Sequence, residues 1–299
     1  MKDLSFDLVA GEVKEIAPGV RAVVAGNEGP FTFKGTVTYI VGQGQVAIID
    51  PGPDEPAHID AVLEALRNET VTHVFVTHTH RDHSCASGAI KARTGAMVLA
   101  EGPHRLAWPL EEDDSNPLDA NADFDFRPDF VLRDKDTVTG PGWTIEAVAT
   151  PGHTPNHMAY ALREASALFS GDHVMAWSTS IVAPPDGLLS DYMASLWKLQ
   201  ERDETVYFPG HGNPVRNVPL ALRTYIRHRQ GIDASICKRL SDGPMTIPAL
   251  VRAIYGDIDA KLAGALCLSL LAHVEDLMAR QNVIAEGPST MARLYRLAA

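Results

Sequence analysis

Short apolar runs separated by turn residues dominate the first two thirds of the chain. Each run is rich in Val, Ile, Phe and Ala and is either continuously apolar or alternates with polar residues, as strands buried on one or both faces do. Gly42, Gln43 and Gly44 separate two of the runs and predict a tight turn. The predicted strands cover residues 19–25, 35–41, 45–50, 74–76, 96–100, 144–149, 167–170 and 206–208.

Three segments between these strands carry apolar residues at helical spacing. They predict helices over residues 56–68, 84–94 and 191–203, and Ser190 is the expected N-cap of the third helix. Because strands alternate with helices along this part of the chain, the pattern indicates the α/β class of fold.

Residues 110–130 interrupt this pattern. The segment contains eight acidic residues, one Arg and two prolines, and its apolar residues follow no regular period. A stretch of this kind is typical of a surface insertion. We expect a solvated loop here in preference to a lid that selects substrates.

The last part of the chain predicts three helices followed by a β-hairpin, an arrangement that describes a winged-helix module. The predicted helices and strands cover residues 220–240, 247–255, 259–281, 282–285 and 291–297. We place the boundary of this module between residues 214 and 219. The chain is therefore expected to contain a catalytic domain, residues 1–215, and a winged-helix domain, residues 216–299.

The charge of the chain is unevenly distributed. The net charge of the 299 residues is −12, yet residues 216–299 contain 11 Lys and Arg against 7 Asp and Glu. The tail is thus +4 and the remainder −16. An acidic body repels polyanions, which disfavours a nucleic acid as the substrate of the first domain.

Three features of the sequence indicate the cellular compartment of the protein. The N-terminal residues carry acids and no apolar core of a secretory signal, and the longest apolar run, about 262–274, is shorter than the roughly 20 residues that span a bilayer. The three cysteines, Cys85, Cys237 and Cys267, form no C-x-x-C pair, which favours a reducing compartment. We expect a cytoplasmic protein that does not bind membranes.

The densest group of chemically active residues follows the strand at 74–76. His78, His80, Asp82 and His83 lie within six residues, at the carboxyl end of a predicted strand, where open α/β sheets usually place their ligand sites. His78 and His80 are two apart on a nearly extended backbone, so both imidazoles point the same way. Four ligand-type side chains in one turn indicate metal binding, and two pairs suit two ions better than one.

Three other predicted strands end in the same way, with an apolar run, a glycine turn and a possible metal ligand. These ligands are His153, Asp172 and His211. Asp50 ends a fourth strand and is expected to orient a ligand histidine. The segment 177–189, rich in Ser, Thr and Pro, is expected to lie over the site.

This H-x-H-x-D-H motif, with the three later ligands in this order, resembles the metallo-β-lactamase superfamily. The resemblance covers about residues 18–215 and implies an αββα sandwich. The chain also has the winged-helix tail, and residues 192–196, after Asp172, read Tyr-Met-Ala-Ser-Leu. With these features it resembles the subgroup that includes β-lactamase-like protein 2 and endoribonucleases. It departs from the usual pattern at Val37 and at Cys85-Ala86, on the substrate side.

The resemblance implies a site for two divalent cations. Zinc is the expected metal, with iron and manganese as alternatives. A water shared by two such cations loses a proton near neutral pH, and the hydroxide formed is the expected nucleophile, with Asp82 as the catalytic residue that orients it. His173, His157 and Tyr192 are candidate proton donors, although a structural role is favoured for each. By resemblance, the first metal is held by His78, His80 and His153, the second by Asp82, His83 and His211, and Asp172 bridges them.

Three functions compete on this evidence. The favoured one is hydrolysis of a small ester, thioester or lactone, in line with the acidic body. The alternative is a metal-dependent endoribonuclease that holds RNA through cationic side chains of the helix at 220–240. A winged-helix regulator that binds nucleic acid ranks third, because the apolar face at 262–271 suits packing or a homodimer better than a DNA groove. The cationic side chains are Arg223, Arg227, Arg229, Lys238 and Arg239.

Overall fold

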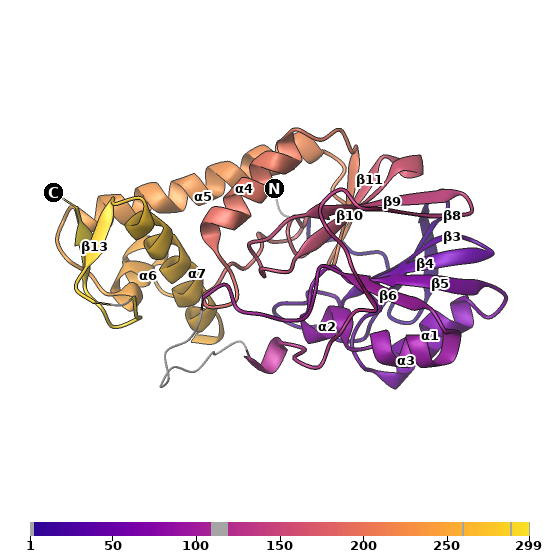
Figure 1. The fold of residues 1–299 in the computed structure, drawn as a ribbon. Helices are drawn as coiled ribbons and strands as arrows, with labels where there is room; N and C mark the ends of the chain where they lie inside the picture. The colour runs from indigo at the N-terminus through magenta and orange to yellow at the C-terminus, as the bar shows by residue number, and fades with distance from the viewer. Residues whose placement is uncertain (1–2, 109–118, 259, 288, 299) are drawn as a thin grey trace.

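Two β-sheets pack face to face in the computed structural model, which describes residues 3–108, 119–258, 260–287 and 289–298 (Figure 1). The first sheet contains, in spatial order, β1 (Val13–Ala17), β2 (Val20–Val24), β3 (Val37–Gln43), β4 (Gln45–Ile49), β5 (Thr70–Phe75), β6 (Met97–Ala100) and β7 (Phe130–Val131). The second contains β12 (Val206–Pro209), β11 (Ala167–Gly171), β10 (Met158–Leu162), β9 (Trp143–Ala149) and β8 (Thr137–Gly140).

Helices cover the outer faces of both sheets (Figure 1). The first sheet is covered by α1 (Pro56–Ala65) and α3 (Ser87–Thr94), and the second by α4 (Leu189–Gln200) and the first half of α5 (Val218–Leu240). The short helix α2 (Arg81–Ser84) follows β5, and two 3-10 turns lie at Asp119–Asn121 and Arg163–Ala165. The expected αββα sandwich is confirmed.

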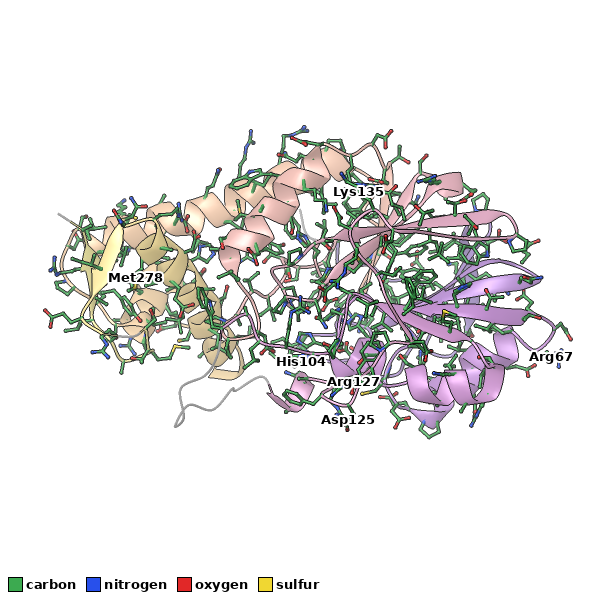
Figure 2. All side chains as sticks on the ribbon, viewed as in Figure 1. Arg67, His104, Asp125, Arg127, Lys135 and Met278 are labelled. Atoms are coloured by element: carbon green, nitrogen blue, oxygen red, sulfur yellow. The ribbon has the colours of Figure 1, made fainter. Side chains whose placement is uncertain are left out.

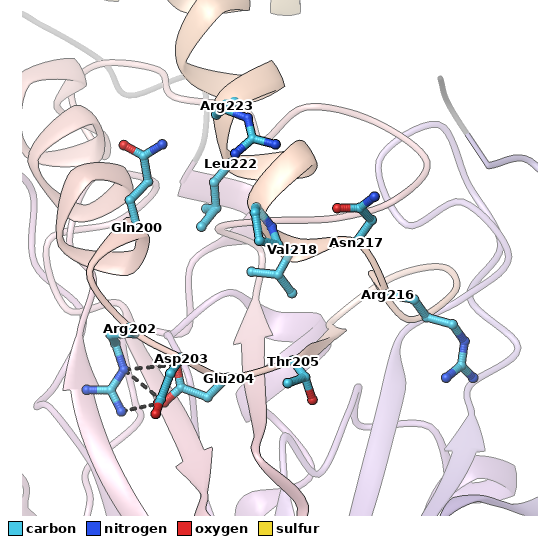
Figure 3. A pocket seen from close by; sticks show the side chains of 11 residues that line it. Gln200, Arg202, Asp203, Glu204, Thr205, Arg216, Asn217, Val218, Leu222 and Arg223 are labelled. Carbon is cyan, nitrogen blue, oxygen red and sulfur yellow. Dashed lines mark hydrogen bonds and ion pairs between the residues drawn. The ribbon is translucent and has the colours of Figure 1, made fainter.

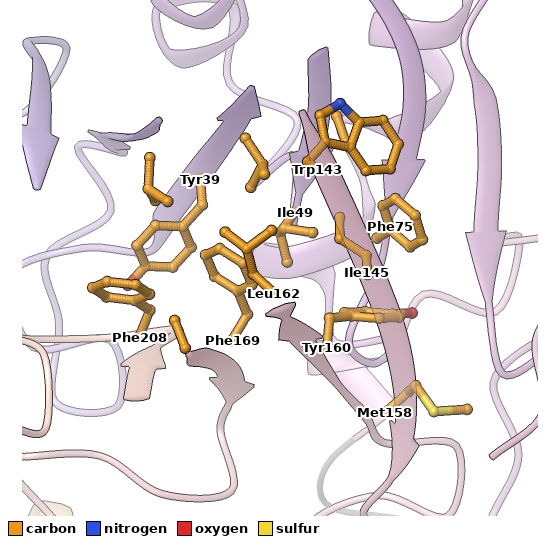
Figure 4. Packing of buried hydrophobic residues seen from close by; sticks show 14 of the residues in the cluster. Tyr39, Ile49, Phe75, Trp143, Ile145, Met158, Tyr160, Leu162, Phe169 and Phe208 are labelled. Carbon is orange, nitrogen blue, oxygen red and sulfur yellow. The ribbon is translucent and has the colours of Figure 1, made fainter. Parts of the chain in front are cut away.

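Alternation along the strands explains why the sheets are covered on both faces. In β3, Val37, Tyr39 and Val41 face the second sheet, whereas Ile40 packs toward α1 and α3. In β10, Tyr160 likewise faces the first sheet. The core between the sheets is rich in aromatic rings (Figure 4), and each fully buried large side chain contributes about 1.5–3 kcal/mol. Alternate residues of each strand therefore face opposite layers, and this alternation fixes which face of the strand packs against the other sheet and which packs against the helices.

The C-terminal module has a core of its own and lies at one end of the molecule, where Figure 2 labels Met278; Arg67 lies at the other end. The winged-helix expectation is confirmed by α6 (Ile247–Tyr255), α7 (Ala260–Ala279), β13 (Val283–Ala285) and β14 (Tyr295–Leu297). The helix α5 contributes to both cores, because Leu222 packs against the second sheet and Ile236 packs within the module. The division at residues 215 and 216 stays a prediction.

Among the described residues, α7 is long and apolar enough to cross a membrane by length and composition, with a mean hydropathy of 1.5 over Leu262–Ala279. Only 33% of this window is buried inside the protein. Its second half packs in the core of the module through Leu270, Val274 and Leu277, whereas Leu262 is 43% exposed. The buried second half of α7 thus has the role of a core helix. A core helix of this length and composition meets the same criterion as a helix that crosses a membrane.

Several local predictions were wrong, for identifiable reasons. The helix expected over 84–94 begins earlier and is divided into α2 and α3, because the Ala86 N–H donates to the Gly52 carbonyl at 3.0 Å. Ser190 is not the N-cap of α4, which begins at Leu189 because the side chain of Leu189 is buried under the helix. The strands β1, β7, β8 and β10 were not predicted.

The acidic segment at 110–130 is only partly a solvated loop. Its first part, residues 110–118, lies outside the described residues. Asp123 is buried and accepts hydrogen bonds from Ser84 Oγ at 2.7 Å and Cys85 Sγ at 3.4 Å, and Phe126 packs into the core beside α3. The second part of the segment is therefore anchored beside the helix that follows His83.

Candidate metal centre

All seven predicted ligands come together at one edge of the sandwich. They follow the carboxyl ends of β5, β9, β11 and β12, so strands from both sheets deliver side chains to the same place. The ligand atoms form three overlapping groups, each with its atoms within 4.8 Å of one another. Convergence of this kind from four separate strands indicates one shared site. The groups are His78, His80 and His153; His78, His83 and Asp172; and Asp82, His83 and His211.

The first group consists of three imidazoles. His80 Nδ1 lies 3.0 Å from His78 Nε2 and 3.0 Å from His153 Nε2. Burial, followed by the neighbouring imidazoles, holds the pKa of His78 well below its usual value, and burial followed by His80 lowers the pKa of His153 to about 4. Neutral imidazoles offer lone pairs, so these rings are suited to bind a cation.

The group of Asp82, His83 and His211, called the second group from here on, combines one carboxylate with two imidazoles. Asp82 Oδ2 lies 3.3 Å from His83 Nε2 and 3.4 Å from His211 Nε2. Burial opposes ionisation of Asp82, but the neighbouring His83 and His211 lower its pKa below the ordinary value. The group therefore carries an anionic oxygen beside two ring nitrogens, a donor set that borderline divalent cations accept.

Asp172 lies between the two groups. Its Oδ1 is 3.3 Å from His211 Nε2 and 3.6 Å from His83 Nε2, and its Oδ2 is 3.8 Å from His153 Nε2. Burial opposes the charge, yet His211 and His83 hold the pKa of Asp172 well below its usual range. One carboxylate thus presents one oxygen to each group.

The residues fit a bound divalent cation on an observation independent of the motif. His83 Nε2 and Asp172 Oδ1 are buried, and neither has a hydrogen-bond partner among the described residues. A buried polar atom left without a partner costs about 1–3 kcal/mol, and two such atoms that face one another are suited to share a bound cation. Nitrogen and oxygen donors without cysteine suit zinc, iron or manganese.

A second layer of contacts fixes the orientation of the ligand rings. The expectation for Asp50 is confirmed, because its Oδ2 lies 2.9 Å from His83 Nδ1. The other carboxylate oxygen accepts the Thr77 backbone N–H at 2.7 Å. His153 Nδ1 donates to the Ile181 carbonyl at 2.6 Å, which confirms that the segment 177–189 reaches the site. Each such bond holds the opposite ring nitrogen toward the cluster.

Nothing in the sequence pointed to Thr36. This buried residue donates its hydroxyl to Asp82 Oδ2 at 2.9 Å, and Asn27 in turn donates to the Thr36 hydroxyl at 2.9 Å. The neighbouring Val37, where the sequence departs from related proteins, is buried in the core between the sheets. Thr36 therefore orients the carboxylate that belongs to the second group.

Two of the three candidate proton donors are engaged in hydrogen bonds through their side chains. His157 Nε2 accepts the Asp172 backbone N–H at 3.3 Å, and its Nδ1 is 2.8 Å from Thr150 Oγ. Tyr192 donates its hydroxyl to the His173 carbonyl at 2.8 Å and stacks on the His173 ring. Burial raises the pKa of Tyr192 to about 12. These contacts favour positioning roles for His157 and Tyr192, whereas neither ring nitrogen of the buried His173 has a hydrogen-bond partner among the described residues.

A separate cavity of about 460 Å³ lies where the end of α4 faces the start of α5 (Figure 3). Its lining includes Arg202, Arg216 and Arg223, but Arg202 is already paired with Glu204 at 2.5 Å. None of the seven ligand residues lines this cavity. It is therefore distinct from the candidate metal centre.

One cationic residue that the sequence placed on a polar helix face is buried. Arg229 is 2% exposed and donates to the Ser180 carbonyl, so the prediction that it binds a phosphate backbone was wrong. The reason is its place on the buried side of α5, beside Tyr225 and Ile226. Arg223 and Arg227 on the same helix are exposed.

Comparison with known proteins identifies related chains. Residues 31–211 match the family model of the Metallo-beta-lactamase superfamily, and residues 246–289 match that of the Beta-lactamase associated winged helix domain. The chain is 28% identical to the Lactamase-like protein adaB of Aspergillus niger, in an alignment covering 95% of this chain and 88% of that protein. It is 30% identical to an atrochrysone carboxyl ACP thioesterase of Aspergillus terreus, over 82% of this chain and 74% of that protein.

A solved structure supports the same fold. The crystal structure of a metallo-beta-lactamase family protein from Thermus thermophilus matches with a TM-score of 0.76. The match covers 95% of this chain and 100% of that chain at 23% sequence identity. At this identity the likeness concerns the arrangement of the elements, including the C-terminal module.

Proposed function

The chain belongs to the metallo-β-lactamase superfamily, and from this premise we propose that it is a binuclear metal-dependent hydrolase of a thioester or a related small acyl ester. The observation that carries the proposal is the position of Asp172, which offers one oxygen to each ligand group. Two divalent cations, which we propose to be zinc, would supply a deprotonated water near neutral pH and polarise the acyl carbonyl.

The side chains of this protein prepare the site for an attacking water. Asp82 and Asp172 are held ionised by the adjacent imidazoles, and their side chains remain 25% and 12% exposed. A water between them is within reach of two acceptors that fix its orientation. Asp82 is the proposed catalytic residue, because Thr36 holds the oxygen that faces His83 and His211 in a fixed orientation.

The leaving group favours a thioester. A departing thiolate is a weak base, with a pKa of about 8.5 for its conjugate acid, so it needs little help from a proton donor. His157 and Tyr192, two of the three candidates for such a donor, are engaged in structural contacts. The relative named an atrochrysone carboxyl ACP thioesterase supports the same substrate class.

RNA cleavage is the second candidate, and the exposed Arg223 and Arg227 on α5 favour it. Against it stand the net charge of −16 outside the tail and the buried position of Arg229, which removes one cation from the helix surface. An alkoxide leaving group is also far more basic than a thiolate, and so depends more strongly on a proton donor. We therefore rank the acyl substrate first.

The substrate prediction is tested by assaying the zinc-loaded protein with thioesters, p-nitrophenyl esters, lactones and single-stranded RNA side by side. Thioester hydrolysis is expected to change less than about twofold between roughly 50 and 200 mM salt, because no phosphates are bound. RNA cleavage that falls steeply with salt, and that disappears in an Arg223→Ala/Arg227→Ala variant, would reverse the ranking. Arg67→Ala, at the far end of the molecule, is the matched control (Figure 2).

The cytoplasmic location and the homodimer stay predictions, and the second is testable on α7. The exposed apolar residue Leu262 lies on the first half of this helix, so we propose that it packs against a second copy of the chain. Leu262→Glu is expected to convert a dimer into a monomer in light scattering, and an unchanged mass would contradict the dimer. Truncation at Val215 is a poorer test, because it also removes Leu222 from the core of the second sheet.

A further inference from the structure

The segment at residues 177–188, which we call the covering segment, holds part of the first ligand group. Its Ile181 carbonyl accepts the Nδ1–H of His153 at 2.6 Å. Its Asp186, which is 1% exposed, places Oδ2 3.9 Å from His80 Nε2. The covering segment therefore accepts a hydrogen bond from one imidazole of the first group and places a buried carboxylate near a second imidazole.

The helix α5 holds the covering segment from outside. Tyr225 donates its hydroxyl to the Ser178 carbonyl at 2.6 Å and accepts the Met175 N–H at 2.9 Å. One turn later on the helix, Arg229 Nη2 donates to the Ser180 carbonyl at 2.5 Å. Ser180 is the residue before Ile181, so this bond fixes the peptide next to the one that orients His153.

Arg229 is itself held by the C-terminal module. His273 on α7 is fully buried, and its Nε2 lies 3.5 Å from Arg229 Nη1. Asp233 is 2.6 Å from His273 Nδ1, so the proton resides there and Nε2 can accept from the guanidinium. The guanidinium carbon also lies 5.0 Å from the centre of the Tyr192 ring, a cation–π contact.

A buried guanidinium is costly unless every contact is made, so this charge is a poor means of adding stability. Its contacts instead fix the orientation of the groups that it bonds, because the N–H donors of a planar guanidinium form hydrogen bonds in fixed directions. The chain of bonds runs from α7 through His273 and Arg229 to Ser180, and the next carbonyl binds His153.

We propose that Arg229 is a positioning residue for the first metal site, through which the winged-helix module becomes part of that site. The inference rests on the proposed binuclear centre. It assigns the module a role in metal binding that requires neither nucleic acid nor a second copy of the chain. It also explains why a cation lies on the buried face of α5.

The test measures metal affinity at each site separately. The full-length protein is titrated with ¹¹³Cd²⁺, which gives one NMR signal for each ligand group, and affinities are obtained by competition with a chelator. In Arg229→Gln the first site is expected to weaken about tenfold, at the lower end of the effect of outer-shell partners, while the second site changes less than about twofold. Arg229→Lys is expected to lose less affinity at the first site than Arg229→Gln, because lysine retains the positive charge and one hydrogen-bond donor.

Two controls separate positioning from stability. Arg227→Gln, on the exposed face of the same helix, should leave both affinities unchanged. Ile236→Val weakens the packing of the C-terminal core, and it does not alter the contacts of the covering segment. A loss of metal affinity at the first site in Ile236→Val equal to the loss in Arg229→Gln would overturn the proposal. An equal loss of affinity at both sites in Arg229→Gln would also overturn it, as would unchanged affinities in the Arg229 variants.

The outcomes also distinguish this inference from the proposed function. A wild-type protein that binds no second cation contradicts the binuclear centre and the inference together. A wild-type protein that binds two cations, with an Arg229→Gln variant that binds both equally well, refutes the positioning role alone. If Arg229→Gln does not fold, Arg229→Lys provides the same comparison.

Discussion

Replacing Asp172 with alanine is expected to weaken metal binding in both ligand groups at once and to lower hydrolysis about 10³-fold. Among the side chains that the structure describes, this carboxylate is the one whose two oxygens face different groups, at 3.3 Å from His211 Nε2 and 3.8 Å from His153 Nε2. Loss of about 4 kcal/mol of charge stabilisation in the transition state corresponds to this factor. Metal content by atomic emission and turnover of a thioester provide the two measurements.

The variant series for Asp172 needs one milder change and one control. Asp172→Asn keeps the shape and one carbonyl oxygen, so it should retain more metal in one group than in the other. Asp125→Ala removes an exposed carboxylate of the same domain and should leave metal and activity unchanged (Figure 2). One tightly held ion in the wild-type protein, with the same ion retained in Asp172→Ala, would contradict the bridging role.

The ligand set could be predicted because its signal is local. Each ligand follows an apolar strand and a turn, and carboxyl ends of parallel strands meet at one edge of a sheet, as β4, β5 and β6 do here. The strand-end positions of His78, His153, Asp172 and His211 made each a candidate ligand, and the resemblance to the family implied how they are divided between two groups. The structure then supplied the distances that separate the two groups.

Thr36 could not be found in this way, because its contact depends on register. It lies just before β3, and it reaches Asp82, 46 residues later, only when β3 pairs with β4 in the observed alignment. A threonine in an apolar strand is also ordinary, since β-branched residues favour strands. The sequence carries no mark that distinguishes it from Thr38, whose hydroxyl bonds His58 instead.

Arg229 was misplaced although a signal for it existed. Leu222, Tyr225, Ile232 and Ile236 are buried along one face of α5, and Arg229 falls in the same stripe at helical spacing. The charge of Arg229 predicts an exposed position, because arginines are rarely buried, whereas the helical period predicts a buried one. A charged residue inside an apolar stripe is informative, since its burial requires specific partners.

Asp50→Asn is expected to weaken the second metal site about 10–100-fold although the two side chains have almost the same shape. The reason is the tautomer of His83. A carboxylate only accepts hydrogen bonds, so Asp50 Oδ2 keeps the proton on His83 Nδ1, at 2.9 Å, and leaves Nε2 free to bind a cation. In the variant, Oδ1 still accepts the Thr77 N–H, so the amide nitrogen must face His83.

An amide nitrogen donates, so His83 Nδ1 would have to lose its proton and Nε2 would carry one toward the cluster. A protonated ring nitrogen cannot bind a metal, and the second site loses one of its two imidazoles. Titration with ¹¹³Cd²⁺ should show the second signal weakened and the first within about threefold of the wild-type affinity, with Asp54→Asn, an exposed residue nearby, as the control. Equal affinity of Asp50→Asn and wild-type protein for the second ion would show that Asp50 does not set the tautomer of His83.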